Sequence, residues 1–406
     1  MPVTINTPLT LQSGLVFPNR LVKAAMTEGL ADPRNRVTEE HLRVGNVVID
    51  AKAGDDEIGM FSRWVDAAKS QGAAFIMQVS HAGRQTPKLV NPRPAAPSPV
   101  ALGLPGGQFG QPRAMTQDEI RHVVEGFGRA TRLAKEVGFD GVQVHAAHGY
   151  LLSSFLSPLA NRREDDWGGP LENRARLLAD CVRETKIEGG AAFSVSVKLN
   201  SADFQKGGFS HVDCLMVIDM LNALGVDFVE ISGGNYEQPR MMDMEGLEPS
   251  FEEPKRSSTR EREAYFLTYA KSVQDRASMP LMVTGGFRTL AGMNAAVAAG
   301  ETDLIGIGRP LCVDTATPIK LLSGQIEAAD RWESRLRIGP GIFGPNSPIK
   351  LIKALNGFGA QGWYYEQIRF LAADMAPDPE LGVLQAFLKH QRREASGARA
   401  WRAAMP

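Results

Sequence analysis

The chain has 406 residues, with 45 lysines and arginines against 46 aspartates and glutamates, so it has no net charge that would attract nucleic acid or a membrane surface. Hydrophobic residues make up 43% of the sequence, but no apolar run is long enough to span a membrane, and the start MPVTINTPLTLQSG has no signal-peptide pattern. The three cysteines, Cys181, Cys214 and Cys312, lie far apart without metal-like spacing, so we expect buried thiols in a cytoplasmic protein.

Short apolar runs alternate with amphipathic segments along most of the chain. Arg20–Thr27 is the first expected strand. Phe61–Lys69 has a helical pattern and precedes an expected buried strand at Ala73–Val79. His81–Gly110 is rich in proline and glycine and is expected to be a loop.

The pattern becomes regular after this loop. Thr116 and Glu119 have the spacing of a capping box, which predicts a helix that runs to about Val137. The later elements are predicted as strand Phe139–Val144, helix Glu172–Thr185, strand Phe193–Leu199, helix His211–Leu224, strand Phe228–Ile231, helix Glu261–Arg276, strand Leu281–Thr284, helix Leu290–Ala299 and strand Leu304–Ile307. Repeated strand–helix units at this spacing are typical of a parallel α/β fold.

The number of units favours a TIM (β/α)8-type barrel over a doubly wound sheet. No G-x-G-x-x-G sequence follows a predicted strand, so a Rossmann domain is not indicated. We expect residues 1–370 to form the barrel and residues 371–406 to form a C-terminal helical tail. The basic stretch Lys389–Arg402 in that tail is interpreted as a solvated helix face.

The segment between Thr27 and Ala73 is too short for the elements that a complete barrel needs there. A barrel of eight units allots roughly 30 residues to each strand–helix pair, and two pairs do not fit comfortably in this interval. We therefore expect a barrel that is incomplete at its second strand. Val44–Ile49 is a candidate for a substitute second strand, but it lacks a proper preceding helix.

Two histidines and a tyrosine follow the expected strand Phe139–Val144. His145, His148 and Tyr150 leave its C-terminal end together, where barrels place their chemistry. Two neutral imidazoles can hold one substrate oxygen by hydrogen bonds, and a phenol beside them can donate a proton. A metal pair is the alternative, but a metal site needs a third ligand and none is expected in this cluster. A core histidine is the other alternative.

Glycines and an arginine follow the last two expected strands. Gly285 and Gly286 come after one, and Gly308 and Arg309 come after the other. Glycine at a strand end usually marks only a turn. Two such sites at the seventh and eighth strands match the phosphate site of barrel enzymes, where backbone N–H groups face the anion and an arginine adds a charged contact.

Two polar side chains stand near the ends of other buried strands. Gln78 is either an end-of-strand amide or a group that both donates to and accepts from a ligand. Lys198 is costly in a buried strand unless it meets a partner. An internal salt bridge and a contact with a bound cofactor both remain open for this lysine.

The run HAAHGYLLSSFLSPLANRREDDWGGPLENR resembles the signature of the Old Yellow Enzyme family of flavin-dependent ene-reductases, and GFGAQGWYYEQIRFLA near the end is also similar. The resemblance implies an FMN-containing barrel that uses NADH or NADPH to reduce activated C=C bonds of enones or related electrophilic alkenes. It implies that His145 and His148 grip the substrate carbonyl and that Tyr150 donates the proton. Relative to the family pattern, about one helix and one strand are absent near residues 40–50.

The resemblance also assigns cofactor roles. Gln78 would bind the pyrimidine edge of the flavin, and Lys198 would stand beside the ring, where the family frequently has arginine. The remaining residues expected to bind FMN are Met26, Thr27, Gly285, Gly286, Gly308 and Arg309. The expected partner is a small-molecule substrate, without nucleic acid or membrane, and a homo-oligomer is left open.

Two other functions remain open from the sequence. The glycine and arginine positions could bind a substrate phosphate in a barrel hydrolase or aldolase rather than FMN. The shortened segment could also make the protein a catalytically impaired relic of a flavoenzyme.

Overall fold

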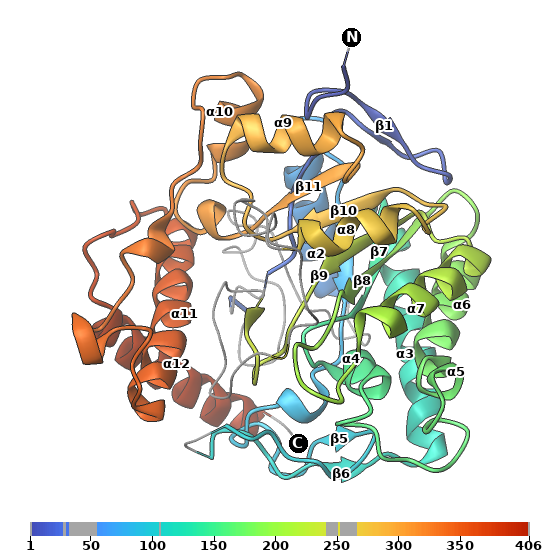
Figure 1. The fold of residues 1–406 in the computed structure, drawn as a ribbon, viewed down its shortest axis with the longest axis horizontal. Coiled ribbons are helices and arrows are strands. Elements are labelled where there is room, and N and C mark those ends of the chain that lie inside the picture. Colours follow the sequence, from blue (N-terminus) through green and yellow to red (C-terminus); the bar gives the residue numbers. More distant parts are fainter. Residues whose placement is uncertain are drawn as a thin grey trace.

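Parallel strands form a curled sheet in the computed structural model, which describes residues 2–26, 30–31, 55–104, 107–240, 251 and 266–404 (Figure 1). The strands are β1 (Leu9–Thr10), β2 (Val16–Phe17), β3 (Leu21–Lys23), β4 (Ile76–Val79), β5 (Ala95–Ala96), β6 (Arg113–Ala114), β7 (Gly141–Ala146), β8 (Ser194–Asn200), β9 (Phe228–Ser232), β10 (Leu281–Thr284) and β11 (Leu304–Ile307). The α-helices are α2 (Asp55–Lys69), α3 (Gln117–Glu136), α4 (Leu151–Leu156), α5 (Leu171–Arg174), α6 (Arg176–Gly189), α7 (His211–Leu224), α8 (Leu267–Gln274), α9 (Leu290–Ala298), α10 (Thr317–Leu322), α11 (Lys350–Ala372) and α12 (Val383–Ala404). Short 3-10 turns are η1 (Gly83–Gln85), η4 (Arg309–Cys312), η5 (Trp332–Ser334) and η6 (Gly341–Phe343).

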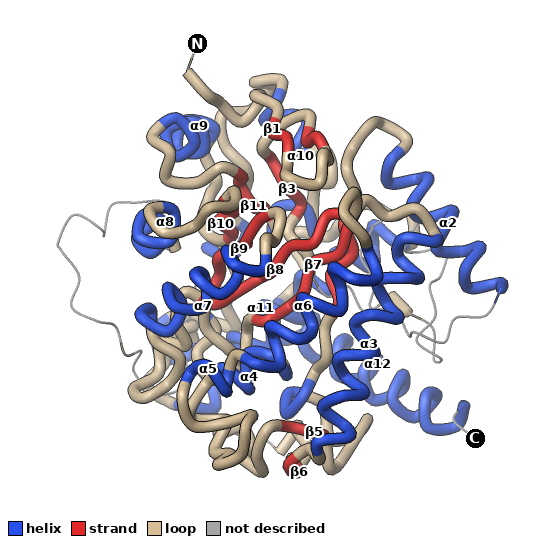
Figure 2. Tube along the Cα trace, turned by 90° about the vertical axis from the view of Figure 1, so that its right-hand side faces the viewer, coloured by secondary structure: helices blue, strands red, loops and turns tan. Residues whose placement is uncertain are grey.

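The helices lie around the sheet (Figure 2), and capping residues in the sequence mark where several of them begin and end. The predicted capping box is present at α3, where the Thr116 side chain accepts from the Glu119 N–H and the Glu119 side chain accepts from the Thr116 N–H. Ser210 and Asp213 form a second capping box at the start of α7. That helix ends at Gly225, whose φ of 62° is a left-handed conformation suited to glycine.

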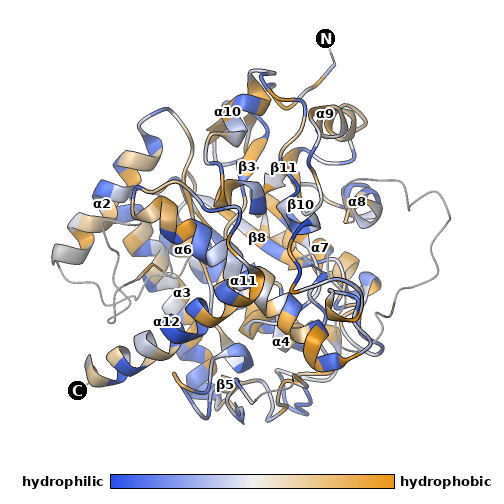
Figure 3. Ribbon diagram, turned by 90° about the vertical axis from the view of Figure 1, so that its left-hand side faces the viewer, coloured by the Kyte–Doolittle hydropathy of each residue, from blue (hydrophilic) through white to orange (hydrophobic). Residues whose placement is uncertain are grey.

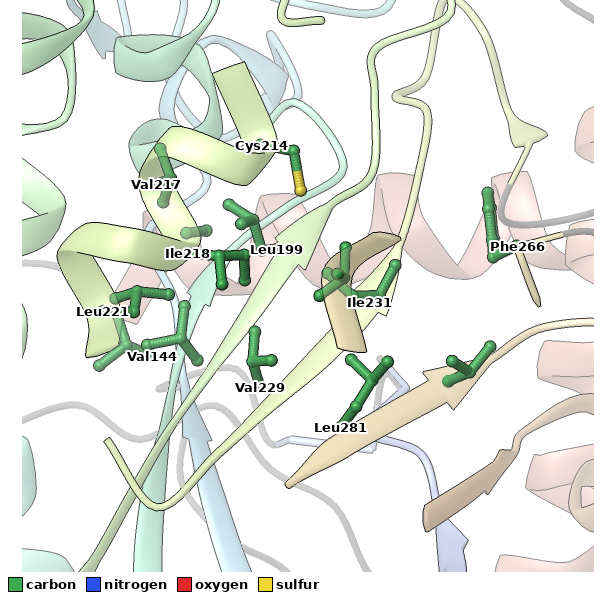
Figure 4. Close-up of a cluster of buried hydrophobic side chains, with 14 of the residues drawn as sticks. Val144, Leu199, Cys214, Val217, Ile218, Leu221, Val229, Ile231, Phe266 and Leu281 are labelled. Carbon is green, nitrogen blue, oxygen red and sulfur yellow. The ribbon is translucent and has the colours of Figure 1, made fainter. Parts of the chain in front are cut away.

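Alternation along the strands separates an apolar layer under the helices from an interior face that combines apolar and polar side chains. Val144, Leu199 and Val229 belong to the main hydrophobic cluster between the sheet and its helices (Figure 4). Their sequence neighbours Lys198 and Glu230 are also buried but lie on the opposite face, because successive side chains of a strand point to opposite sides. The interior of the curled sheet therefore carries charged groups, and these can form part of a functional site there.

The sheet order is β3-β11-β10-β9-β8-β7-β4, with all neighbours parallel. Among the described strands, β3 and β4 are therefore the two edges of a seven-stranded half-barrel. A cavity of about 400 Å³ lies between them, with Lys23, Ala25, Ala74 and Gln78 among its lining residues. The expectation of a TIM-type barrel is confirmed as a half-barrel of seven strands among the described residues. The segment in which the second strand was expected, including Val44–Ile49, lies outside them.

Several predicted boundaries are corrected. The first strand is shorter than Arg20–Thr27, since β3 spans Leu21–Lys23, and among the described strands it pairs with β11 alone. Pairing of β4 with β7 begins at Ile76, three residues later than predicted. The predicted loop His81–Gly110 includes η1 and β5, and β5 pairs with β6 beyond it. The helix predicted at Glu172–Thr185 is divided into α5 and α6. The first residues of the helix predicted at Glu261–Arg276 lie outside the described residues.

The C-terminal helices form a pair beside the half-barrel. Gly359 and Gly362 on α11 allow close approach of α12, because a Cβ on Gly359 would lie 2.6 Å from a methyl carbon of Val383. The Tyr365 and His390 rings stack at 4.6 Å between centroids. The arginines of α12 are largely exposed, as predicted, and Figure 3 shows hydrophilic and hydrophobic residues interspersed along it. The domain boundary at residue 370 stays a prediction. No helix in the described parts of the chain is long and apolar enough to cross a membrane.

Candidate active site

The candidate site lies at the carboxyl ends of the central strands. His145 on β7 is the register partner of Lys198 on β8, which in turn pairs with Glu230 on β9. Because these strands are parallel neighbours, their inward side chains at one level lie next to each other. The register thus brings together an imidazole, an ammonium and a carboxylate from three distant parts of the sequence.

His145 is a buried neutral imidazole with a defined orientation. Its side chain is 5% exposed, and its Nδ1 accepts a hydrogen bond from the Ala147 N–H at 3.2 Å. This bond assigns the ring proton to Nε2, which becomes the donor toward a ligand. Burial, and then the nearby charge of Lys198, holds the pKa of His145 well below its ordinary value, so the ring stays neutral where a free histidine would be half protonated.

His148 is held in a second orientation by its own backbone and side-chain contacts. Its φ is 62°, and its N–H donates to Asn200 Oδ1 at 3.0 Å. Its Nε2 lies 2.8 Å from Ser232 Oγ, and when that hydroxyl donates, the ring proton is on Nδ1. Burial first, then Lys198 and His145, lowers the pKa of His148 well below its ordinary value. The two rings are 5.1 Å apart and nearly perpendicular.

Tyr150 completes the predicted cluster at the start of α4. Its ring lies 5.0 Å from that of His145, and its hydroxyl lies 2.9 Å from the hydroxyl of Tyr236. The preceding Gly149 has a φ of 79°, and a Cβ there would lie 2.7 Å from Gln85 Oε1. Glycine therefore allows the sharp turn that presents the tyrosine next to the imidazoles. The structure brings together all three residues that the sequence singled out.

Lys198 forms a buried ion pair. Its Nζ lies 2.8 Å from Glu230 Oε1, and the two side chains are 4% and 1% exposed. The salt-bridge alternative for this lysine is therefore present, while its contact with a flavin stays a prediction. Glu230 was not predicted from the sequence, although an acidic residue inside the apolar strand FVEIS was a usable signal.

Gln78 lines the cavity between the edge strands, whereas Met26 packs against the cluster that contains Cys312. Gln78 Nε2 donates to Gln143 Oε1 at 2.6 Å, which leaves its carbonyl oxygen and second N–H for another partner. Met26 follows β3, and its sulfur lies 3.8 Å from Cys312 Sγ. Thr27, also predicted to bind the cofactor, lies outside the described residues.

The predicted phosphate site has glycines in the expected backbone conformation. It also contains two charged side chains that were not predicted, Arg288 and Glu333. Gly285 and Gly286 have φ values of 123° and 91°, in the region that favours glycine. Glu333 lies 2.6 Å from Arg288 and 3.8 Å from Arg309. Burial alone would raise the pKa of Glu333, but the charges of the two arginines outweigh it and hold that pKa below its ordinary value.

These groups fit a flavin mononucleotide. Thr284 Oγ1 at the end of β10 and Arg288 Nε are buried polar atoms without a hydrogen-bond partner in the described part of the chain. A phosphate is an anion that positive-φ glycine backbone and arginine side chains can bind. Gln78 offers the amide edge that a flat heterocycle requires. Arg288 was not predicted, although it lies two residues after the glycine pair in the run GGFR.

Comparisons with known proteins identify a family and relatives of this chain. The sequence pattern of the "NADH:flavin oxidoreductase / NADH oxidase family" matches residues 51–327. The NADH-dependent flavin oxidoreductase iccE of Talaromyces variabilis is 32% identical over 415 residues, which cover 90% of this chain and 97% of that protein. The NADH-dependent flavin oxidoreductase iliE of Neonectria sp. is 36% identical over 77% of this chain, which spans only 46% of that relative. The structure of an old yellow enzyme homologue from Zymomonas mobilis superposes with a TM-score of 0.66 at 22% identity, covering 82% of this chain and 96% of the other.

Proposed function

The chain belongs to the NADH:flavin oxidoreductase / NADH oxidase family, and from that premise we propose that it reduces the activated C=C bond of enones or related electrophilic alkenes. FMN would be its cofactor, and NADH or NADPH would be its hydride donor. The observation that carries the proposal is the convergence of His145, His148 and Tyr150 at the carboxyl ends of the strands. Two neutral ring donors and a phenol suit an uncharged substrate that carries a carbonyl or nitro oxygen.

The histidines orient and polarise the substrate. His145 Nε2 and His148 Nδ1 would each donate a hydrogen bond to the same carbonyl or nitro oxygen, which withdraws electron density from the conjugated C=C bond. Tyr150 would give its proton to the α-carbon, so that its O–H bond breaks, a C–H bond forms and the electron pair stays on the phenol oxygen. When bound, the flavin supplies hydride chemistry between the nicotinamide and the β-carbon.

Residues at the remaining strand ends would hold the cofactor. Gln78 would bind the ring edge, Met26 would pack against the ring, and Lys198 would lie beside it. The phosphate would lie at Gly285, Gly286, Gly308 and Arg309. Family membership supports a flavin here and sets aside the alternative of a phosphate-binding hydrolase or aldolase.

We expect the bound flavin to be FMN rather than FAD. The glycine–arginine cluster suits a single phosphate, and the sequence has no dinucleotide motif for an adenosine half. The cofactor is released by heating the purified protein and identified by chromatography, with authentic FMN and FAD as standards. Finding FAD would contradict the assignment, as would an ordered protein that carries no flavin.

We also expect the open half-barrel to weaken FMN retention. Among the described strands β3 and β4 are edges, and an edge leaves backbone N–H and C=O groups without ladder partners next to the proposed cofactor site. The natural chain should bind FMN substoichiometrically and show a clear rise in melting temperature on adding FMN, since the ligand stabilises the folded state by mass action.

The matched comparison is a chain with a family-like helix–strand unit inserted after Arg43. Flavin occupancy, melting temperature and enone reduction are measured for both proteins. If the natural chain retains flavin fully and reduces the enone as fast as the repaired one, the half-barrel is not impaired. The relic alternative then fails as well.

A further inference from the structure

A second tyrosine contacts the proposed proton donor. Tyr236 follows β9, and its hydroxyl lies 2.9 Å from that of Tyr150, with the two rings 5.9 Å apart. On its other side, the ring of Phe109 lies 5.9 Å away. These residues come from three loops at the mouth of the half-barrel. Tyr236 was not singled out from the sequence, because 86 residues separate it from Tyr150.

Hydrogen bonds connect the backbone at Tyr236 to the loop that contains His148. The Tyr236 N–H donates to Gln85 Oε1 at 3.4 Å, and Gln85 Nε2 donates to the carbonyl oxygen of His148 at 2.9 Å. Gln85 itself is 3% exposed. The buried Gln85 amide thus joins the two loops that carry Tyr236 and His148. It keeps the Tyr150 and Tyr236 phenols next to each other.

Asn235 and Glu237, which flank Tyr236, also hold its loop in place. Asn235 Oδ1 accepts from the N–H groups of Glu237 and Gln238, both at 2.9 Å. The Glu237 carboxylate forms an ion pair with Arg84 at 2.6 Å. Arg84 is buried, so this pair is less screened by solvent than a surface pair. The contact between the two phenols therefore belongs to a firmly held loop.

Proton donation creates a problem that this contact would solve. Once Tyr150 has given up its proton, a phenolate remains beside two imidazoles whose neutral form is favoured by burial. A buried charge without a donor is costly. Burial, with the neighbouring Tyr150 as the next cause, raises the pKa of Tyr236 well above its ordinary value, so its phenol keeps its proton and can donate.

We propose that Tyr236 is a positioning residue that aims the Tyr150 phenol and donates a hydrogen bond to the phenolate left after proton transfer. The inference rests on the proposed function and deepens it. It assigns a role to a residue that need not touch the substrate, since Tyr236 acts through the oxygen of Tyr150.

The test is Tyr236→Phe in the FMN-loaded protein. A hydrogen bond to a charged group contributes enough that its loss should slow reduction of an enone by the reduced enzyme roughly 10- to 100-fold. Reduction of the flavin by NADH or NADPH should not change. The alkaline limb of the enone pH profile should move to higher pH, because the phenolate of Tyr150 is then less stabilised. In a Tyr150→Phe background, Tyr236→Phe should add no further loss.

Two control variants separate this role from a structural one. Tyr269→Phe removes another buried phenol, whose ring contacts Phe204 and His211, and should leave both half-reactions unchanged. Glu237→Gln weakens the loop contact with Arg84 but keeps both phenols, so it should not move the alkaline limb. An unmoved limb in Tyr236→Phe, equal slowing of both half-reactions, or additive losses with Tyr150→Phe would overturn the proposal.

An ultraviolet titration of tyrosinate makes the test independent of turnover. We compare the natural protein with Tyr150→Phe and Tyr236→Phe, without substrate. The two phenols should titrate as a coupled pair, so removing either one should change the titration of the other. If the natural enzyme reduces no enone but the coupling is present, the proposed function fails while the contact stands. If the enone is reduced and no coupling is seen, the inference fails alone.

Discussion

Replacing Tyr150 with phenylalanine is expected to slow the reduction of an enone by roughly 10²- to 10⁴-fold and to spare reduction of the flavin by NADH or NADPH. That range is typical for the loss of a positioned general acid. The half-reaction with nicotinamide uses no such acid. The variant keeps the ring that lies 5.0 Å from His145 and loses only the hydroxyl that meets Tyr236.

Stopped-flow measurement of the two half-reactions decides this prediction. Flavin absorbance is followed first with nicotinamide and then with the enone, for the natural protein and for Tyr150→Phe. Tyr269→Phe serves as the control for loss of a buried phenol. Equal slowing of both half-reactions would assign Tyr150 to packing or to nicotinamide binding instead of proton donation.

Replacing Lys198 with methionine is expected to destabilise the fold by roughly 3–5 kcal/mol, because it leaves the Glu230 carboxylate buried without its partner. The double replacement Lys198→Met with Glu230→Leu should recover much of this loss, since two apolar side chains of similar volume need no solvation. Denaturant unfolding of the cofactor-free proteins measures the free energies. A small effect of the single replacement would contradict this expectation and would mean that the Glu230 carboxylate is neutralised or solvated without Lys198.

An exposed ion pair provides the control for Lys198. Arg276 and Asp219 lie 2.5 Å apart with side chains 46% and 45% exposed. Arg276→Met should change the free energy of unfolding little, because solvent screens such a pair. The contrast between Lys198→Met and Arg276→Met identifies burial as the cause of the larger loss of stability.

The family resemblance and the chemistry of single strand ends were readable from local sequence. The spacing of His145, His148 and Tyr150 after one strand needed no long-range information, and the structure places their side chains together. Their roles, and those of the proposed flavin contacts, stay proposals. The glycine pair after β10 was likewise predicted as a turn suited to an anion, and its positive φ values agree with that local reading.

Partners from distant strands could not be predicted in this way. Glu230 meets Lys198 only because β8 and β9 pair in one particular register, and a shift by one residue would turn Glu230 into the apolar layer. Tyr236 reaches Tyr150 through a loop fastened by Gln85. Such contacts depend on strand register and on the positions of loops in the folded chain. Hydrophobic periodicity along the sequence predicts neither.

The sequence by itself determined the parallel α/β class, the capping of the helix after Thr116, the cluster at His145 and the shortage of residues before Ala73. These follow from local spacing and from counting. Only the tertiary structure decided that the shortage leaves β3 and β4 as edges among the described strands, and that the interior is lined by the Lys198–Glu230 pair. The reason is physical: strand order and register are set by packing the whole sheet against its helices, and no single segment contains that information.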